Sequence, residues 1–414
     1  MENTSGCCIL YAMTYLFQLT KTQSAVLLAC FGYAEEAAVP AALCGYPVCA
    51  LAPYAFSEMR SLSLLQEEFW DSSTVYVCSD EAAEPDTGIS SLVPVTAIQE
   101  NTFFSSGSVS VLPRLCGRAL SAVSLPASVQ KIDRYAFYGC EKLRRIQMYS
   151  TTSDLGTGLF MGCDAVSKID MTVTEEGRSC LPEVLLTFRK PLELLYRIQK
   201  KTEPPHTEAL CPVKYHLIFP EYFENADENT PARITTRDLH GSGLFYRNCF
   251  ANTQFQITRY DSLFPHAVAN EPEHVTTALA FFRLACPEGL EAAPRAGYRL
   301  YLSAHAEALA ALLCARFQKG LLHVSDLEAA FSAPPLSAED FFDRLLDETA
   351  HLKVPALSAI LMELRHRRLS SARAQSEEKL LQASDKAARR TSARLEEPRS
   401  AAEKKQPRRR HFEL

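Results

Sequence analysis

"SLPASVQKIDRYAFYGCEKLRRIQM", residues 124–148, is one unit of a repeated pattern. Its second half, "FYGCEKLRRIQM" at Phe137–Met148, returns as "FMGCDAVSKIDM" at Phe160–Met171, an offset of 23 residues. The pattern extends one unit upstream through a cysteine series with nearly the same spacing: Cys116, Cys140 and Cys163. Such a period is typical of a solenoid, because a unit this short can bury its apolar face only by stacking on its neighbours.

The last residues of each unit alternate between apolar and polar side chains, which predicts a short strand with one buried side. We expect strands at Leu143–Met148 and Val166–Met171, adjacent, parallel and in register. Phe137 and Phe160 should stack inside. The outward positions need not serve folding, so they are free to recognise a partner. The predicted partner-binding residues are Arg145, Gln147, Lys168 and Asp170, and the alternative is an ordinary solvated face.

The cysteine series has two explanations. Regularly spaced thiols suggest a metal site, but zinc ligands form a tetrahedral cluster rather than a row. Equivalent positions in stacked turns instead form a ladder with a spacing of about 4.8 Å, and a buried free cysteine is a common small filler. We therefore predict interior thiols, with no metal and no cofactor.

The unit Leu-Pro-x-Ser-Val-x-x-Ile-x-x-x-Ala-Phe-x-x-Cys-x-x-Leu-x-x-Ile, matched nearly throughout by residues 124–146, resembles the leucine-rich repeats of the BspA type. Copies of its first half stand at Leu51–Phe56 and, in weaker form, at Ile98–Phe103. The resemblance thus covers roughly residues 38–171, with a degraded middle. It implies protein recognition without catalysis, since proteins with this repeat are typically bacterial adhesion, surface or interaction proteins. Residues 220–370 resemble the C-terminal part of uncharacterised clostridial leucine-rich repeat proteins, which implies no activity.

The composition is that of a soluble protein, for which we expect neither nucleic acid nor membrane as a partner. Hydrophobic residues make up 47% of the chain and the formal net charge is -6. The exception is the stretch from Ser371 to Leu414, where 12 Lys/Arg outnumber 7 Asp/Glu. We interpret it as a solubilising tail, and the alternative is a basic patch for an acidic partner or nucleic acid.

The 14 cysteines, in a chain with no recognisable signal sequence, favour a reducing compartment, where thiols act as small hydrophobes. No C-x-x-C pair occurs, so neither a zinc ribbon nor a thioredoxin-like motif is predicted. The apolar run Cys7–Phe17 has no basic residues before it and is too short to span a bilayer, so we predict a buried strand. We expect a cytoplasmic protein. A surface adhesin is the alternative, because many proteins with this repeat are exported.

The fold class predicted is α+β, a β-rich solenoid followed by helical hairpins. Residues 181–201 suggest a strand and then a helix, and residues 214–223 an aromatic-rich strand or turn. Apolar residues three and four apart predict helical segments at 273–287, 297–318, 324–333, 337–353 and 354–369. The expected parts are a β cap at 1–37, the solenoid at 38–172, a mixed junction at 173–272, the helical domain at 273–369 and the charged tail at 370–414.

The best place for chemistry is the stretch 228–250, which combines His240 and a Gly-Ser-Gly with three arginines: Arg233, Arg237 and Arg247. Arginines beside the amides of a glycine turn can hold an anion. A lone Gly-Ser-Gly is weak evidence, however, so we favour a surface turn, with a ligand-binding protein or enzyme as the alternative. Five histidines and cysteines match no standard zinc spacing: His206, Cys211, His216, His240 and Cys249. We predict a non-enzymatic interaction protein with no catalytic residues.

Overall fold

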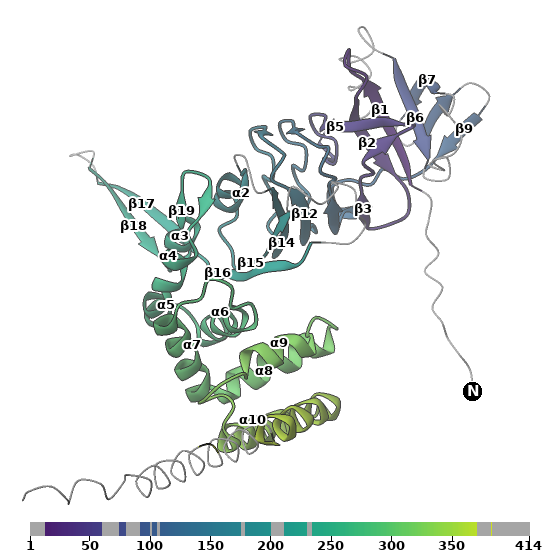
Figure 1. The fold of residues 1–414 in the computed structure, drawn as a ribbon. Helices are drawn as coiled ribbons and strands as arrows, with labels where there is room; N and C mark the ends of the chain where they lie inside the picture. Colours follow the sequence, from purple (N-terminus) through teal and green to yellow (C-terminus); the bar gives the residue numbers. More distant parts are fainter. Residues whose placement is uncertain are drawn as a thin grey trace, which may run out of the picture. The chain divides into compact units, whose positions relative to one another are not determined.

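The computed structural model describes residues 13–59, 74–79, 92–99, 102–105, 108–174, 179–199, 211–229, 234–370 and 382. Internal contacts divide the chain into two compact units, residues 1–330 and 331–414. The first unit contains the sheets and helices α2–α9, and the second contains α10 and a helix over 355–370 (Figure 1). The five-part division expected from the sequence stays a prediction.

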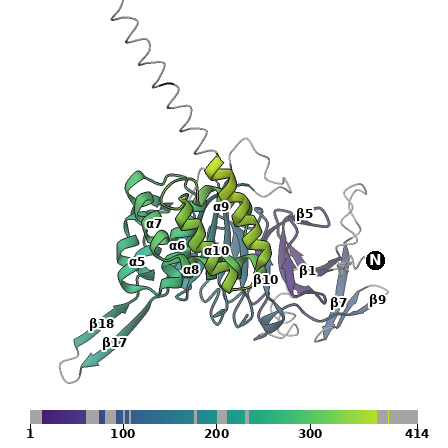
Figure 2. The ribbon, with the colours of Figure 1, turned by 90° about the horizontal axis from the view of Figure 1, so that it is seen from below.

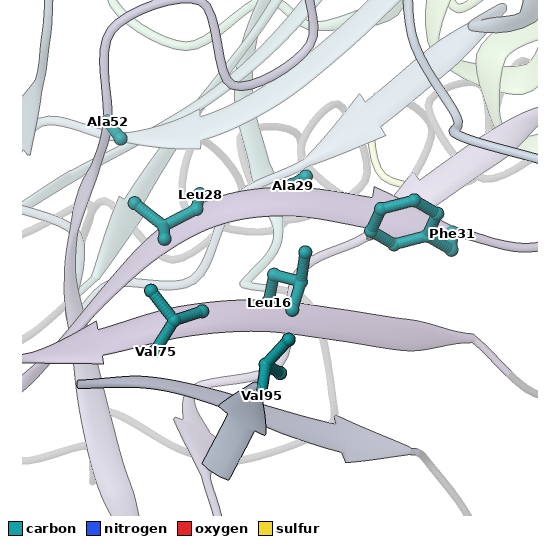
Figure 3. Packing of buried hydrophobic residues seen from close by; sticks show 7 residues of the cluster. All are labelled: Leu16, Leu28, Ala29, Phe31, Ala52, Val75 and Val95. Carbon is teal, nitrogen blue, oxygen red and sulfur yellow. The ribbon is translucent and has the colours of Figure 1, made fainter. Parts of the chain in front are cut away.

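The described N-terminal strands pair mostly antiparallel around an apolar core, and their sheet continues into the solenoid, where β2 pairs in parallel with β5, Tyr46–Leu51. β1 and β2 form an antiparallel hairpin within the segment predicted to be β-rich, and β6 pairs on the other edge of β1. Figure 3 shows Leu16, Leu28, Phe31, Val75 and Val95 packed together in this core. The predicted strand Cys7–Phe17 lies partly outside the described residues. The strands are Thr14–Leu19 (β1), Ala25–Phe31 (β2), Val75–Ser79 (β6), Val93–Gln99 (β7), Thr102–Ser105 (β8) and Ser108–Val111 (β9).

Five strands stack in parallel along one face of the solenoid, in the order β3, β10, β12, β14 and β15 (Figure 1). β12 pairs with β14 from Arg145 opposite Lys168 to Tyr149 opposite Thr172, so the predicted adjacency and register are confirmed. Their inward residues Ile146 and Ile169 are 0% exposed. The strands span Glu36–Ala38 (β3), Ala122–Ser124 (β10), Arg145–Tyr149 (β12), Lys168–Thr174 (β14) and Leu192–Gln199 (β15).

A second row of parallel strands and a ladder of aromatic rings hold the turns together. The strands are Tyr46–Leu51 (β5), Lys131–Ile132 (β11) and Asp154–Leu155 (β13), and Ala42–Leu43 (β4) pairs antiparallel with β5. A 3-10 helix, η2, spans Gly117–Ala119. The rings of Phe56, Phe137, Phe160 and Phe188 stack in sequence with centroids 5.1, 5.4 and 5.1 Å apart. The predicted stacking of Phe137 on Phe160 is confirmed.

The glycine of each Phe-x-Gly-Cys motif has a backbone reason. Gly139 has φ +74° and Gly162 has φ +80°, in the left-handed region that strains any residue with a Cβ. A chain reversal at this point turns the backbone from the aromatic ladder into the next strand. The glycine is therefore repeated because the turn requires a positive φ, and it is not a sign of a ligand-binding loop.

A long insertion separates the first turn of the solenoid from the second. β3 pairs directly with β10, and Phe56 stacks directly on Phe137, so these turns are neighbours in space. The described strands between them, β6–β9, form antiparallel pairs instead. The repeat copy predicted at Ile98–Phe103 is wrong, because Ile98 lies opposite Phe103 in the β7–β8 hairpin. Alternating apolar residues fit a hairpin as well as a solenoid strand.

Residues 181–201 fold in the opposite order to the predicted strand and helix. The helix α2, Leu181–Thr187, comes first and carries a proline in its first turn, where its missing N–H costs no hydrogen bond. β15 follows as the next solenoid strand, with Leu192, Leu194 and Tyr196 buried at every second position. The apolar run that suggested a helix therefore has the period of a strand.

Beyond β15 the sheet ends with an antiparallel strand. β16, Val213–Phe219, pairs with β15 and confirms the aromatic-rich strand predicted there. A two-stranded hairpin then projects from the body of the unit (Figure 1, Figure 2). The short strands are Phe223–Asn229 (β17), Ile234–His240 (β18), Phe250–Ala251 (β19) and Gln254–Phe255 (β20).

The chain after Pro272 is helical, as predicted, except that the segment expected at 297–318 breaks at His305 into two helices. No single helix among the described residues is long and apolar enough to cross a membrane, although α7 and α8 together pass by length and composition, with a bend of 92°. The helices of this unit are Gly243–Arg247 (α3), Ile257–Ser262 (α4), Phe264–Asn270 (α5), Glu273–Ala285 (α6), Ala292–Ala304 (α7), Ala306–Gln318 (α8) and Val324–Ala330 (α9).

The second unit pairs α10, Glu339–His351, with the helix over 355–370. Its apolar interior includes Phe331, Phe341 and Phe342, whose rings meet edge to face. On the surface Arg365 bridges the two helices through ion pairs with Glu339 at 2.8 Å and Asp343 at 3.0 Å. Apart from residue 382, the predicted tail beyond residue 370 lies outside the described part of the chain.

Candidate interaction surface

The outward side chains of the parallel solenoid strands form one surface, which we name the outer face. The strand register aligns them in rows. The first row is Glu36, Ala122, Arg145, Lys168 and Glu193. The second row is Ala38, Ser124, Gln147, Asp170 and Leu195. The four predicted contact residues therefore lie on one face, as the alternation along each strand requires.

Arg145 reaches across its row to Glu36, two strands away. The intervening side chain is the methyl group of Ala122, which leaves room for the arginine to extend over β10. The Arg145 Nη2 donates to Glu36 Oε2 at 2.7 Å, with the two side chains 51% and 62% exposed. An exposed pair of this kind contributes about 0.2–1 kcal/mol, so a partner can take over either side chain at little cost.

The opposite end of the first row is covered by helices of the same unit. Glu193 accepts hydrogen bonds from both terminal nitrogens of Arg316 on α8, at 2.6 and 3.1 Å. Lys168 pairs with the same carboxylate at 3.2 Å. His216 lies 3.0 Å from it through Nε2 and stacks on Phe282 of α6 with ring centroids 3.7 Å apart. Lys168 is thus engaged within the chain.

Burial sets the charges in this cluster. It lowers the pKa of His216 more than the neighbouring carboxylate raises it, so the ring is neutral and donates its Nε2–H to Glu193. Burial also raises the pKa of Glu193, but hydrogen bonds from His216 and Arg316 outweigh it and hold that pKa well below its usual range. Glu193 is therefore an anion that ties the repeat sheet to α8.

Asp170 is also engaged inside the molecule, in the second row. It is 7% exposed and accepts two hydrogen bonds from Arg197, at 2.7 Å to Oδ1 and 3.0 Å to Oδ2. The remaining guanidinium nitrogen of Arg197, Nη1, donates to the Cys211 carbonyl at 2.5 Å. Arg145 is exposed and Gln147 half-buried, so the open part of the outer face lies over β3, β10 and β12.

The Gly-Ser-Gly turn holds an anion that belongs to the chain itself. The backbone N–H and the hydroxyl of Ser242 both donate to Glu271 Oε1, at 2.5 and 2.6 Å. Gly241 has φ +79° and Gly243 has no room for a Cβ beside the Pro220 carbonyl, so both glycines serve this tight turn. The carboxylate of Glu271 therefore occupies the position at the Gly-Ser-Gly turn where a ligand anion would bind.

Arg247 is a structural residue and not a ligand-binding one. It is 1% exposed, and its guanidinium donates to five backbone carbonyls: those of Leu185, Phe188, Lys190, Pro220 and Gly243. These carbonyls come from α2, the chain after it, the end of β16 and α3, so one side chain joins four segments. Arg233 lies outside the described residues, as does the side chain of Arg237.

Of the five histidines and cysteines considered as zinc ligands, the four that the structure describes are not grouped into a metal site. His240 stacks on Phe223 with centroids 4.5 Å apart, and Cys249 donates to the Phe245 carbonyl at 3.5 Å. His206 lies outside the described residues. Among the described residues, no three His, Cys, Asp or Glu side chains are grouped so as to hold a metal ion.

The cysteine ladder lies inside the solenoid, where the thiols of Cys140 and Cys163 donate to the aromatic position of the preceding turn. Cys140 Sγ donates to the Phe56 carbonyl at 3.2 Å, and Cys163 Sγ to the Phe137 carbonyl at 3.0 Å. Cys116 is buried in the first position of the series. A hydrogen bond to Cys163 and burial raise the pKa of Cys140 far above its usual range. These thiols are structural fillers.

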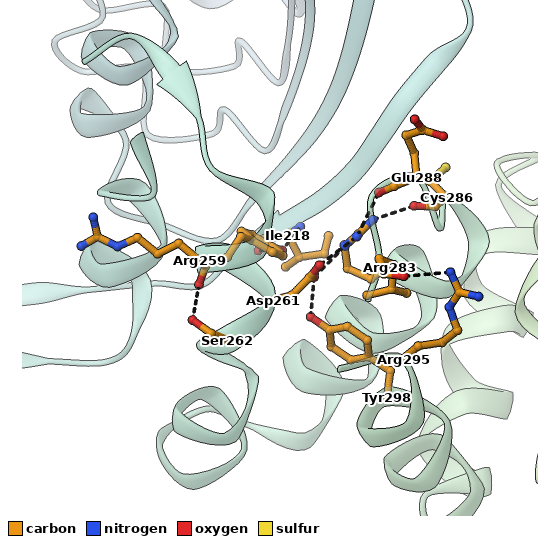
Figure 4. A network of polar contacts seen from close by, with 11 residues as sticks. Ile218, Arg259, Asp261, Ser262, Arg283, Cys286, Glu288, Arg295 and Tyr298 are labelled. Carbon is orange, nitrogen blue, oxygen red and sulfur yellow. Dashed lines mark hydrogen bonds and ion pairs between the residues drawn. The ribbon is translucent and has the colours of Figure 1, made fainter. Parts of the chain in front are cut away.

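Sequence reasoning missed a buried ion pair that fixes the helices (Figure 4). Arg283 of α6 is 0% exposed and donates to both oxygens of Asp261 on α4, at 2.8 and 2.9 Å. Tyr298 of α7 donates to the same carboxylate at 2.8 Å. The signal available in the sequence was Arg283 itself, a charge in the middle of the otherwise apolar stretch "ALAFFRLA".

The comparisons with known proteins agree with this geometry. Residues 115–183 match the family model described as "BspA type Leucine rich repeat region (6 copies)". No curated protein and no solved structure matches the chain. Leucine-rich repeats of this kind have a general role in protein interaction and are generally not enzymes. The match, the parallel strands and the stacked turns together identify the first unit as carrying a BspA-type leucine-rich repeat solenoid.

Proposed function

We propose that this protein is a non-enzymatic scaffold that binds another protein through the open part of its outer face. The observation that carries the proposal is that Arg145 stands more than half exposed on a rigid sheet, with only the exposed carboxylate of Glu36 as a partner in the described structure. A rigid sheet presents its side chains without the ordering cost that a flexible segment incurs on binding. Binding a partner through this face therefore loses little conformational entropy.

The contact residues supported best are Arg145 and Gln147. Lys168 and Asp170 hold Glu193 and Arg197 in internal ion pairs, so in this proposal they shape the surface rather than reach the partner. The cytoplasmic location stays a prediction, as does the expectation that the partner is a protein rather than nucleic acid or a membrane.

The test uses affinity capture from the native host, followed by binding measurements on variants against the captured protein. Arg145→Glu combined with Gln147→Ala is expected to weaken binding about tenfold or more, since a central charge reversal leaves an uncompensated charge. Lys168→Glu is unsuitable, because it would face Glu193 and destabilise the sheet.

The matched control is Lys142→Glu, an exposed charge reversal in the turn before β12 and outside the outer face. It should leave affinity unchanged. A second comparison deletes residues 371–414. If deletion abolishes binding while the Arg145 variant binds normally, the basic tail and not the outer face is the recognition element.

A further inference from the structure

The last turn of the solenoid, residues 155–163, has a backbone edge that nothing in the described structure pairs. In the turn before it, three N–H groups donate to carbonyls of this last turn. The bonds are Tyr135 N–H to Thr157 O at 3.1 Å, Phe137 N–H to Leu159 O at 3.1 Å and Gly139 N–H to Met161 O at 2.9 Å. The turn before that does the same, from Tyr54 and Phe56 to Arg134 and Ala136, at 3.3 and 2.8 Å.

The equivalent donors of the last turn are Gly158, Phe160 and Gly162, one repeat further along. Within the described residues their N–H groups have no hydrogen-bond partner. The reason is the helix α2, which replaces the next turn. A helix uses its carbonyls internally, so it offers side chains to the solenoid end and leaves the aligned donors unfilled. Gly158 and Gly162 are exposed, so the edge is accessible.

A groove lies along this edge, between the last turn and α2. It consists of two adjoining cavities of about 480 and 370 Å³ that share Phe160, Met161 and Thr187. Leu155, Leu159 and Val184 give the first cavity an apolar wall, and Met161 stands at the rim with 59% of its side chain exposed. The aromatic ladder itself is already closed by Phe188, 5.1 Å from Phe160.

We propose that this groove binds a segment of a partner protein that folds as one more repeat turn and so extends the solenoid at this end. Carbonyl oxygens at every second residue of the segment accept from Gly158, Phe160 and Gly162. An aliphatic side chain between them enters the cavity at Leu155, Leu159 and Val184. Residues 157–161 already accept from the turn before them in this manner, folded in reverse turns with Gly158 at φ +66° and the Met161 N–H bonded to the Gly158 carbonyl at 3.2 Å.

The site is separate from the outer face and does not depend on the function proposed for that surface. Arg145 and Gln147 lie on the strand side of the turns, whereas the groove follows the aromatic turn and α2. Substitutions on the outer face should therefore leave groove binding intact. Failure of one proposal leaves the other standing.

The experiment uses a capped synthetic peptide, GTGLLMG, which copies Gly156–Gly162 with leucine in place of the phenylalanine, because Phe188 already occupies the ring position beside Phe160. Its carbonyls correspond to those of Thr157, Leu159 and Met161, which accept from the three donors one turn earlier. NMR on the deuterated, amide-protonated full chain follows the amides of Gly158, Phe160 and Gly162. Without peptide, they should exchange with solvent faster than the amides of Tyr135, Phe137 and Gly139. Peptide should shift their resonances and slow their exchange about tenfold or more.

Thr187→Trp is the matching variant, since Thr187 is exposed and borders both cavities. It should weaken peptide binding about tenfold. Leu186→Trp is the control, because Leu186 is 42% exposed on the same helix but does not line either cavity. Slow exchange of the three amides in the free protein would overturn the proposal. So would peptide shifts that map elsewhere, or equal binding by the Thr187 variant.

Discussion

The rings of Phe56 and Phe137 lie parallel, with centroids 5.1 Å apart and an interplanar angle of 7°, although the antiparallel strands β6–β9 come between them in the sequence. Successive turns of this solenoid are therefore defined by the ladder of buried rings and not by an unbroken sequence repeat. The ladder holds its spacing across the insertion because the backbone bond from Phe56 N–H to the Ala136 carbonyl, 2.8 Å, fixes the same offset.

Phe137→Ala should destabilise the solenoid by about 3–5 kcal/mol, because the ring is 0% exposed and touches rings on both sides. The measurement is denaturant unfolding followed by circular dichroism. Lys142→Ala, an exposed side chain in the same turn, is the control and should change stability by less than about 0.5 kcal/mol. Equal stability of the two variants would show that the ring ladder does not support the array.

The ladder cysteines should not react with a thiol reagent until the protein unfolds. Cys140 and Cys163 are 0% and 3% exposed, and the pKa of Cys140 is raised, so almost no thiolate is available. Mass spectrometry after brief alkylation, with and without denaturant, measures this directly. Elemental analysis of the same sample checks for metal. Rapid native labelling of either residue, or stoichiometric zinc, would contradict the structural assignment.

Arg283→Met should cost about 3–5 kcal/mol, because it leaves the carboxylate of Asp261 buried with Tyr298 as its remaining side-chain donor. Arg283→Met with Asp261→Asn removes the charge as well and should recover part of the loss. Thermal melts of the single and double variants give the comparison. The control is Arg259→Met, an exposed arginine on the same helix as Asp261. A double variant less stable than Arg283→Met would argue against charge burial as the cause.

Acidification should destabilise the first unit in a window set by His216. Burial lowers the pKa of His216 in the folded state, while the unfolded chain takes up a proton near pH 6.5, the ordinary value. Stability therefore falls as the pH drops from about 7 toward 5, by at most about 1.4 kcal/mol per pH unit. Glu193 adds a further loss below about pH 4.3, because its folded pKa is depressed.

His216→Gln tests this window, since glutamine can donate to Glu193 but does not titrate. Its unfolding free energy should change less between pH 7 and pH 5 than that of the parent chain. His240→Gln, which removes an exposed histidine, should keep the parent's dependence. Identical pH profiles for the parent and the His216 variant would show that the ring is not neutral in the folded protein. The groups facing His216 are Glu193, Arg316, Lys168 and Phe282.

The solenoid was predictable because its signals are periodic and local. The offset of 23 residues between Phe137 and Phe160 placed both strands, their register and the ring stack. The insertion was not predictable in the same way, because Ile98–Phe103 satisfies a strand pattern whether the strand is parallel or antiparallel. The order of α2 and β15 was misjudged for a related reason, since a short apolar run fits both periods.

The availability of the predicted contact residues could not be read from the sequence. Alternation correctly placed Lys168 and Asp170 on the outer face, but their partners come from later segments: Glu193 and Arg197 on β15. Arg316, 123 residues further along the chain, also donates to Glu193. Contacts at such separation leave no periodic trace in one chain.

We expect the insertion also to set the order in which the turns of the solenoid assemble during folding. β10, β12, β14 and β15 come from nearly continuous sequence, so their pairing closes short loops at a small entropic cost. The first turn reaches β10 only after a much longer stretch of chain has closed, and its contacts have high sequence separation. We expect pulse-labelled amides of β12 and β14 to gain protection before those of β3 and β5, so that the array grows from its C-terminal turns toward its N-terminal end.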